Sequence, residues 1–210
     1  MNKETRLHSL VNPNAKKLAA AVIQSGGVIA FPTDTVYGIG VSAFNKKAID
    51  KIYDVKGRSQ IKAIPILGSD VQDLDEITPP LSSRIRKIVA NFWPGALTLV
   101  LPASSRLPEN LSPTPTIGVR IPDLDEVRNL LRLTGPLAAT SANLSGEPSA
   151  LTAGDVLQQL GGRIDLILDG GPVFGGEAST VLDCSGEELK ILREGPISLD
   201  AILRVLDEGN

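Results

Sequence analysis

Hydrophobic residues along the chain follow two patterns, one typical of helices and one typical of short buried strands. In the helical pattern, apolar residues return every three or four positions, as Ala48, Ile49 and Ile52 do, and therefore share one face. This pattern predicts helices over residues 14–25, 45–54, 81–92, 123–133, 152–160 and 198–206. Short apolar runs bounded by polar residues or glycine predict strands over residues 28–31, 37–41, 63–67, 97–101, 117–121, 137–140, 166–169, 180–183 and 189–193.

The ends of two predicted helices carry recognisable signals. Asn12 is a suitable N-cap for the first helix, and Gly26 ends it. Asp123 is expected to cap the helix over 123–133. Because helices and strands are interspersed along the whole chain, the pattern predicts a single α/β or α+β domain built on one mixed sheet.

The composition excludes several kinds of chemistry. The 210 residues include one His and one Cys, so neither a dithiol centre nor a zinc site of about four Cys and His ligands can form within the chain. Cys184 has no base near it in sequence, and we interpret it as a small buried residue. The net charge of −3 argues against a basic field over the whole surface. We find no signal peptide and no apolar run of about 20 residues, and expect a cytoplasmic protein without membrane contact.

Three polar segments are candidates for a binding site. Lys56 and Arg58, separated by one glycine, suit a polyphosphate, although a solvated turn is the commoner role of such a triplet. Arg120 lies in an apolar run and needs a partner, which leaves both a structural salt bridge and an anion-binding role open. Thr33 and Thr35 fit either a hydroxyl-stabilised turn or a ligand contact.

Other segments narrow the chemistry further. Ser141 and Asn143 form either a turn or a set of ligand donors. The glycine-rich stretch 170–176 matches no phosphate-binding fingerprint and is interpreted as a mobile loop. Trp93 is interpreted as a packing residue at a helix end. A chain without a nucleophile–base pair would act through cations, hydroxyls and backbone donors, which suits positioning substrates around a phosphoryl or nucleotidyl centre.

Taken together, several motifs resemble the YrdC/TsaC family. They are GGVIAFPTDTVYGIG at 26–40, KGR at 56–58, FWPGALTLVL at 92–101, IGVRIP at 117–122, AATSANLSG at 138–146, STVLD at 179–183 and LREG at 192–195. The resemblance covers about residues 12–196 with the motifs in family order. It implies an open twisted mixed sheet with flanking helices around a concave, positively lined cavity. It also implies a single domain over 1–210, the short form without a second C-terminal domain.

The resemblance further implies an enzyme, L-threonylcarbamoyladenylate synthase. Threonine, bicarbonate and ATP would give threonylcarbamoyl-AMP and pyrophosphate, for N6-threonylcarbamoyladenosine at position 37 of tRNAs. Mg²⁺ is expected with ATP as the substrate, but no metal ligand from the protein is assigned. A threonylcarbamoyl transferase complex would take the product, and a weak contact with tRNA is a further expectation.

Site residues follow from the matched motifs. The implied catalytic set is Lys56, Arg58, Ser141 and Asn143. The implied ATP contacts are the same four residues with Thr116 and Arg193. The implied threonine contacts are Arg120, Ser141, Ser179 and either Thr33 or Thr35.

Some positions depart from the family pattern, and the sequence leaves two alternative functions. Ser59 and Thr140 stand where the family often has Pro, Leu67 stands about where long members have His, and 149–152 replaces a usual Ser-Pro-Thr. One alternative is a double-stranded RNA or tRNA-binding module without turnover. The other is a carbamoyl-transfer enzyme of hydrogenase maturation, whose additional regions this length and Cys count do not accommodate.

Overall fold

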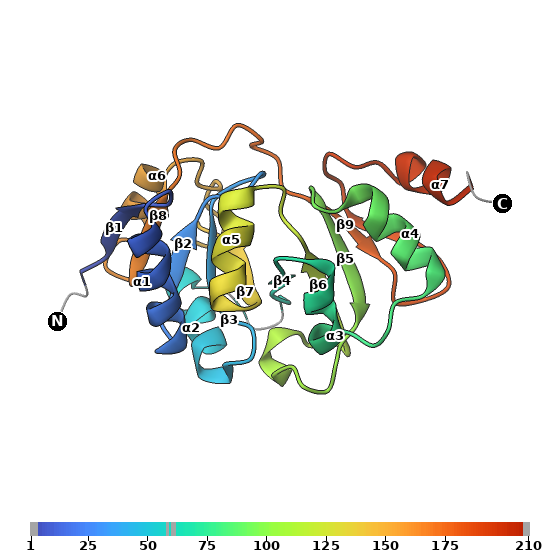
Figure 1. The fold of residues 1–210 in the computed structure, drawn as a ribbon, viewed down its shortest axis with the longest axis horizontal. Coiled ribbons are helices and arrows are strands. Elements are labelled where there is room, and N and C mark those ends of the chain that lie inside the picture. Colours follow the sequence, from blue (N-terminus) through green and yellow to red (C-terminus); the bar gives the residue numbers. More distant parts are fainter. Residues whose placement is uncertain (1–3, 58, 60–61, 208–210) are drawn as a thin grey trace.

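The computed structural model describes residues 4–57, 59 and 62–207 (Figure 1). Its strands are β1 (Arg6–Ser9), β2 (Ile29–Phe31), β3 (Gly38–Ser42), β4 (Ile66–Leu67), β5 (Leu97–Pro102), β6 (Thr116–Arg120), β7 (Leu137–Ser141), β8 (Leu166–Asp169), β9 (Thr180–Asp183) and β10 (Lys190–Arg193). Its α-helices are α1 (Pro13–Gln24), α2 (Lys46–Lys56), α3 (Leu74–Ile77), α4 (Ser83–Phe92), α5 (Asp125–Thr134), α6 (Ala153–Leu160) and α7 (Leu199–Asp207).

Ten strands within the described residues form one sheet in the order β1-β8-β2-β3-β7-β4-β6-β5-β9-β10. The β1–β8, β2–β8, β4–β6 and β5–β9 pairs are parallel, and the other five pairs are antiparallel. The predicted mixed sheet with flanking helices is therefore confirmed.

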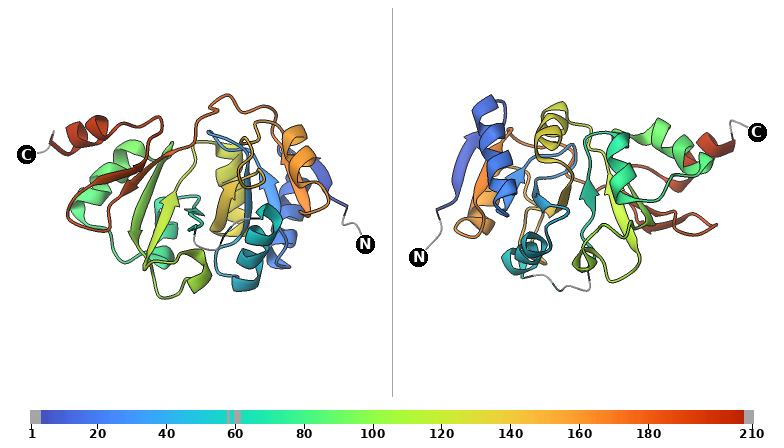
Figure 2. Two further views of the ribbon diagram at one scale, coloured as in Figure 1. Left: turned by 180° about the vertical axis from the view of Figure 1, so that it is seen from behind. Right: turned by 60° about the horizontal axis from the view of Figure 1, so that its bottom comes forward.

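Helices cover both faces of the sheet, and a central strand such as β2 is buried on both sides. Ile29 and Phe31 of β2 pack with α1 and α5, whereas Ala30 belongs to the core cluster that includes α2 and α6. Figure 1 shows α1 and α5 in front of the strands, and the view from behind in Figure 2 shows α2 and α6 over the opposite face. At the other end of the sheet, α4 and α7 pack against each other.

Two predicted elements differ from the structure. Asp123 does not cap α5, because the helix begins at Asp125 and Leu124 occupies the N-cap without a side-chain bond. The acidic first turn, Asp125 and Glu126, instead complements the positive end of the helix dipole. The strand expected over 63–67 is only the two residues of β4, because the preceding Pro65 has no N–H to donate to a ladder.

β1 and α3 were not predicted. All four residues of β1 are exposed, so no apolar alternation marks it, and its backbone pairing with β8 holds it at the sheet edge. The lone histidine, His8, lies in this edge strand. In the described part of the chain, no helix is long and apolar enough to cross a membrane.

Candidate functional site

A cavity of about 410 Å³ lies over the central strands. Its lining residues include Thr98 and Val100 of β5, Gly118 and Arg120 of β6, Ala139, Thr140 and Ser141 of β7, Val181 of β9 and, just before β9, Ser179. In β5 and β6 the lining residues are two positions apart, which places them on one face of the sheet. The alternate residues of β5 and β6, such as Leu99 and Val119, belong to the core on the other face.

Small residues make this face concave. Gly118 contributes no side chain at the floor, and a Cβ there would lie 3.2 Å from both Pro65 Cβ and Thr98 Cγ2. Leu67 and Ala139 line the cavity and also belong to the cluster around α1 and α5, so the cavity opens on that face of the sheet beside α5. The cavity therefore occupies a part of the face that helices leave uncovered.

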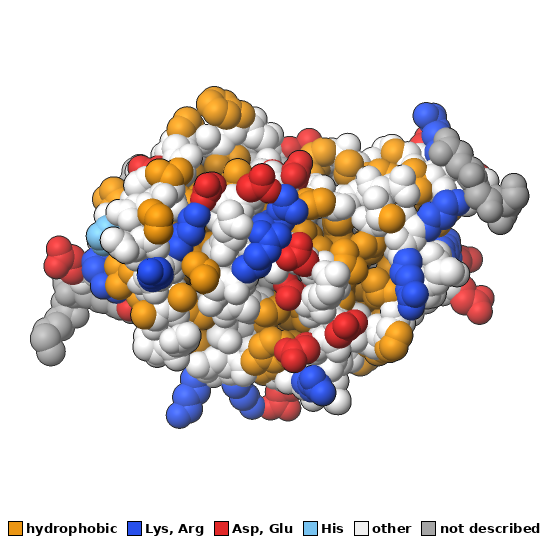
Figure 3. Space-filling view, viewed as in Figure 1, with side chains coloured by type: hydrophobic (Ala, Val, Ile, Leu, Met, Phe, Trp, Pro, Cys, Tyr) orange, Lys and Arg blue, Asp and Glu red, His pale blue; other side chains and the backbone are white. Residues whose placement is uncertain are grey.

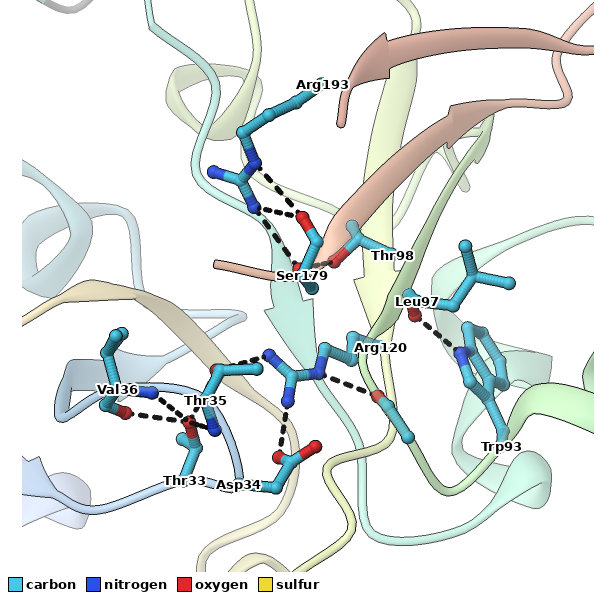
Figure 4. A network of polar contacts seen from close by, with 11 residues as sticks. Thr33, Asp34, Thr35, Val36, Trp93, Leu97, Thr98, Arg120, Ser179 and Arg193 are labelled. Atoms are coloured by element: carbon cyan, nitrogen blue, oxygen red, sulfur yellow. Dashed lines mark hydrogen bonds and ion pairs between the residues drawn. The ribbon is translucent and has the colours of Figure 1, made fainter. Parts of the chain in front are cut away.

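Arg120 is the central charged group of the cavity wall, and its side chain is only 7% exposed. Its Nε donates to the Gly95 carbonyl at 2.9 Å and one terminal nitrogen donates to Thr35 Oγ1 at 2.9 Å, as Figure 4 shows. The other terminal nitrogen forms an ion pair with Asp34. Burial lowers the pKa of the guanidinium, the Asp34 carboxylate opposes this shift, and Arg193 adds to it. The salt bridge considered from the sequence is therefore present.

The loop between β2 and β3 is held by the hydroxyl of Thr33. Its Oγ1 donates to the Val36 carbonyl at 2.7 Å and accepts the backbone N–H of Thr35 and of Val36, each at 3.2 Å. It also lies 2.9 Å from Thr35 Oγ1. This is the hydroxyl-stabilised turn weighed from the sequence, and it leaves Thr33 and Thr35 both lining the cavity.

The Phe-Trp-Pro-Gly segment supplies the carbonyl beneath Arg120. Trp93 is 8% exposed and donates its Nε1 to the Leu97 carbonyl at 2.7 Å, so it packs as predicted. A Cβ on Gly95 would come within 2.5 Å of the Phe92 carbonyl, which explains why glycine occupies the position. The Gly95 N–H in turn donates to Ile121, which ties the segment to the end of β6.

Ser179 and Arg193 form a second polar group on the wall. Arg193 donates from Nε and from one terminal nitrogen to the Ser179 carbonyl, at 3.0 and 2.7 Å, and to Ser179 Oγ at 3.2 Å (Figure 4). Ser179 Oγ also lies 2.8 Å from Thr98 Oγ1. Burial lowers the pKa of Arg193. Two guanidinium groups thus face one cavity.

Lys56 has a different place from the one expected. It is the last residue of α2 rather than part of a solvated loop, and it is 3% exposed. Its ammonium donates to the Ser141 carbonyl, to the Asn143 carbonyl at 2.5 Å and to Asn143 Oδ1 at 3.4 Å. Gly57, in the left-handed conformation at φ 59°, ends the helix directly after it. Lys56 therefore fixes the loop after β7 from beneath.

The structure brings most of the predicted site residues to the cavity. Thr33, Thr35, Arg120, Ser141, Ser179 and Arg193 line it, whereas Lys56 and Asn143 lie behind Ser141. Thr116 is at the start of β6, beyond the lining, where its hydroxyl lies 2.9 Å from that of Thr114. Arg58 lies outside the described residues. Leu67 and Thr140, two of the departures from the family pattern, both line the cavity.

Asp34 and Thr98 are site features that the sequence did not single out. Alternation along β5 would have placed Thr98 on the face opposite Leu97 and Leu99, but only the sheet order brings it beside Ser179. The glycine-rich stretch joins β8 to β9, and the Gly176 N–H donates to the Thr35 carbonyl at 3.0 Å. Among the described residues, no group of three or more His, Cys, Asp or Glu is arranged to bind a metal.

Comparison with known proteins gives a consistent result. A family model for Sua5, YciO and YrdC proteins, described as "Telomere recombination", matches residues 21–195. A threonylcarbamoyl-AMP synthase of Bacillus subtilis is 42% identical over 194 residues, which are 90% of this chain and 55% of that protein. A threonylcarbamoyl-AMP synthase of Bos taurus is 37% identical over 206 residues, which cover 92% of this chain and 72% of that protein. The chain spans little more than half of the B. subtilis relative.

Solved structures agree with the sequence matches. The crystal structure of P. abyssi Sua5 complexed with L-threonine has a TM-score of 0.90 and 33% identity, and the match covers 98% of this chain and 61% of that one. The structure of E. coli YciO has a TM-score of 0.83 and 25% identity, and the match covers 95% of this chain and 99% of that one.

The Lys56 contacts predict a loss of stability when the ammonium is removed. We expect Lys56→Ala to lower the free energy of unfolding by about 1–3 kcal/mol, because buried carbonyls of Ser141 and Asn143 lose a charged donor. Lys47→Ala, at an exposed position of the same helix, is the matched control and should change stability little. Urea titration measures both, and equal midpoints for the two variants would contradict the structural role.

Burial predicts that Cys184 is inert. Burial, with a smaller effect of Asp183, raises the pKa of the thiol to about 12. At pH 8 the native protein should hold on the order of a thousandfold less thiolate than the unfolded chain. Alkylation by iodoacetamide, followed by mass spectrometry, should therefore be slow in the native protein and fast in urea. Equal rates in the two states would show that Cys184 is accessible and reactive.

Proposed function

The chain belongs to the Sua5/YciO/YrdC family, and on that premise we propose that it is a threonylcarbamoyl-AMP synthase. The observation that carries the proposal is the cavity wall itself. Arg120, which is buried, and Arg193, which is exposed at the cavity wall, place two cations beside the hydroxyls of Thr35, Ser141 and Ser179. This donor set suits a ligand with a carboxylate and phosphates, and the volume lies in the range of small-molecule sites, about 300–1,000 Å³.

The proposed reaction uses the substrates' own nucleophiles. The threonine amine attacks bicarbonate, a C–N bond forms, and the displaced hydroxide leaves as water with one amine proton. A carbamate oxygen then attacks the α-phosphorus of ATP, and the bond to the pyrophosphate oxygen breaks. The products are threonylcarbamoyl-AMP, pyrophosphate and water. The chain's contribution is to hold the carbamate in line with the phosphorus and to stabilise the charge that develops on pyrophosphate.

The site residues named from the sequence have the following places in this scheme. Arg120 binds the threonine carboxylate, and Ser179 with Thr35 or Thr33 orients the rest of the amino acid. Arg193, Ser141, Asn143, Thr116 and Arg58 serve ATP, Arg193 from the wall where Ser179 now accepts two of its N–H groups. Lys56 acts on this side by holding the Ser141–Asn143 loop.

A metal ion would come with the nucleotide. The described residues offer no cluster of carboxylates or imidazoles for Mg²⁺, which is often carried largely by substrate phosphates. We therefore propose Mg²⁺ as part of the ATP substrate and route no step through a protein-bound ion.

The product and its use are also part of the proposal. Threonylcarbamoyl-AMP is a mixed anhydride, and a transferase that modifies adenosine 37 of tRNA would consume it in the cytoplasm. Figure 3, seen from the side of α1 and α5, shows acidic and basic side chains interspersed. The ion pair Lys16–Glu126 joins α1 to α5, and Arg132 of α5 pairs with Asp70. Such interspersed charge gives no support to RNA binding without turnover.

An omission experiment tests the function. Pyrophosphate release should require L-threonine, bicarbonate and ATP together, because no earlier step frees pyrophosphate from ATP. Each substrate is left out in turn, and the nucleotide product is identified by mass. Release without threonine or bicarbonate would contradict the proposal. Salt-sensitive tRNA binding without turnover would favour the RNA-binding alternative.

Arg120 variants test the amino-acid contact. Arg120→Ala should raise the threonine KM on the order of tenfold to a hundredfold, because a charged hydrogen-bond donor to the carboxylate is lost. The KM for ATP should change much less. Arg120→Lys keeps the charge but not the planar guanidinium. Its threonine KM should therefore lie between those of the unaltered protein and of Arg120→Ala. A threonine KM equal to that of the unaltered protein in both variants would remove Arg120 from this role.

A further inference from the structure

Asp34 lies directly behind the charged centre of the cavity. Its neighbours Thr33 and Thr35 both line the cavity, whereas Asp34 does not, and the turn held by the Thr33 hydroxyl fixes this arrangement. In Figure 4 the Asp34 carboxylate is on the side of the Arg120 guanidinium away from Ser179 and Arg193. Its side chain is 16% exposed.

Three contacts from two loops hold the Arg120 guanidinium. The Gly95 carbonyl takes the Nε hydrogen, and Thr35 Oγ1 and the Asp34 carboxylate each take one hydrogen of a terminal nitrogen. Each terminal nitrogen therefore keeps one further N–H, and the residue forms part of the wall. Of the three acceptors, only Asp34 carries a charge, and this charge opposes the lowering of the guanidinium pKa by burial.

From this arrangement we propose that Asp34 is a positioning residue that fixes Arg120 for the substrate carboxylate without touching the substrate. The inference rests on the threonine-dependent reaction proposed above. A carboxylate inside the cavity would repel the ligand carboxylate, but one behind the guanidinium orients it and leaves the remaining N–H groups to the ligand. The long, flexible arginine side chain needs such anchors to present its donors in one direction.

The kinetic signature of this role is specific. The contact between Arg120 and the carboxylate is present in the bound substrate and in the transition state alike, so its loss raises KM and leaves kcat nearly unchanged. We expect Asp34→Ala to raise the threonine KM about tenfold or more, with the ATP KM and kcat within about twofold. Asp34→Asn keeps an oxygen acceptor and should raise the threonine KM less, about threefold.

Two controls separate positioning from general stability. Glu126→Ala breaks the Lys16–Glu126 pair, in which Glu126 belongs to α5, and should leave both KM values unchanged. In the Arg120→Ala background, adding Asp34→Ala should change the threonine KM little, because the residue through which Asp34 acts is already gone. Circular-dichroism melting of every variant checks that it is folded. If Asp34→Ala does not fold, the threonine KM of Asp34→Asn decides the positioning role.

The outcomes are distinguishable. If the unaltered protein lacks threonine-dependent pyrophosphate release, the proposed function fails and this inference with it. If that activity is present but Asp34→Asn and Asp34→Ala keep the original threonine KM, only the inference is overturned. A lower threonine KM in either variant, or an equal effect of Asp34→Ala with and without Arg120, would overturn it as well.

Discussion

The buried guanidinium of Arg120 is the constraint on which the rest of the site depends. A charge that is 7% exposed cannot remain unpaired, so its surroundings must supply acceptors. They come from Gly95, at the end of the segment after α4, and from Thr35 and Asp34 between β2 and β3. One side chain thereby fixes two loops that are about 60 residues apart in sequence.

Alternation along the strands explains why a cavity can exist beside a complete core. In β5 and β6, Leu99 and Val119 face the helices on one side, while Thr98 and Gly118 face the cavity on the other. The polar and small residues therefore remove no apolar contact from the core on the opposite face, because they lie on the face that α1 and α5 cover only in part. Successive side chains of a strand point to opposite faces of the sheet, and in β5 and β6 this alternation separates the core residues from those of the cavity wall.

Local signals predicted most elements, whereas contacts between distant residues could not be predicted from one sequence. The apolar runs placed β2, β3 and β5 to β10, but the exposed β1 carries no such run and depends on pairing with β8. The Lys56 triplet suited either a polyphosphate site or a solvated turn, and only the fold places its ammonium against carbonyls about 85 residues away. The need of Arg120 for a partner was evident from its apolar surroundings, but which residue met that need depended on the fold.

The electrostatics of the wall fit a reaction in which the protein supplies no nucleophile. Desolvation lowers the pKa of both Arg120 and Arg193, although Arg120 is buried and Arg193 keeps exposure to solvent. Among the described residues, Arg193 donates to neutral acceptors, the carbonyl and hydroxyl of Ser179, whereas Arg120 is paired with the Asp34 carboxylate. An anion near Arg193 therefore meets a charge without an acidic partner, which suits the phosphates of the proposed ATP substrate. The Asp34 carboxylate already balances the charge of Arg120. We therefore expect the direction of the remaining Arg120 N–H groups, more than net electrostatic attraction, to select the ligand there. A carboxylate held in one orientation next to phosphates held by charge is the arrangement that an in-line attack on the α-phosphorus requires.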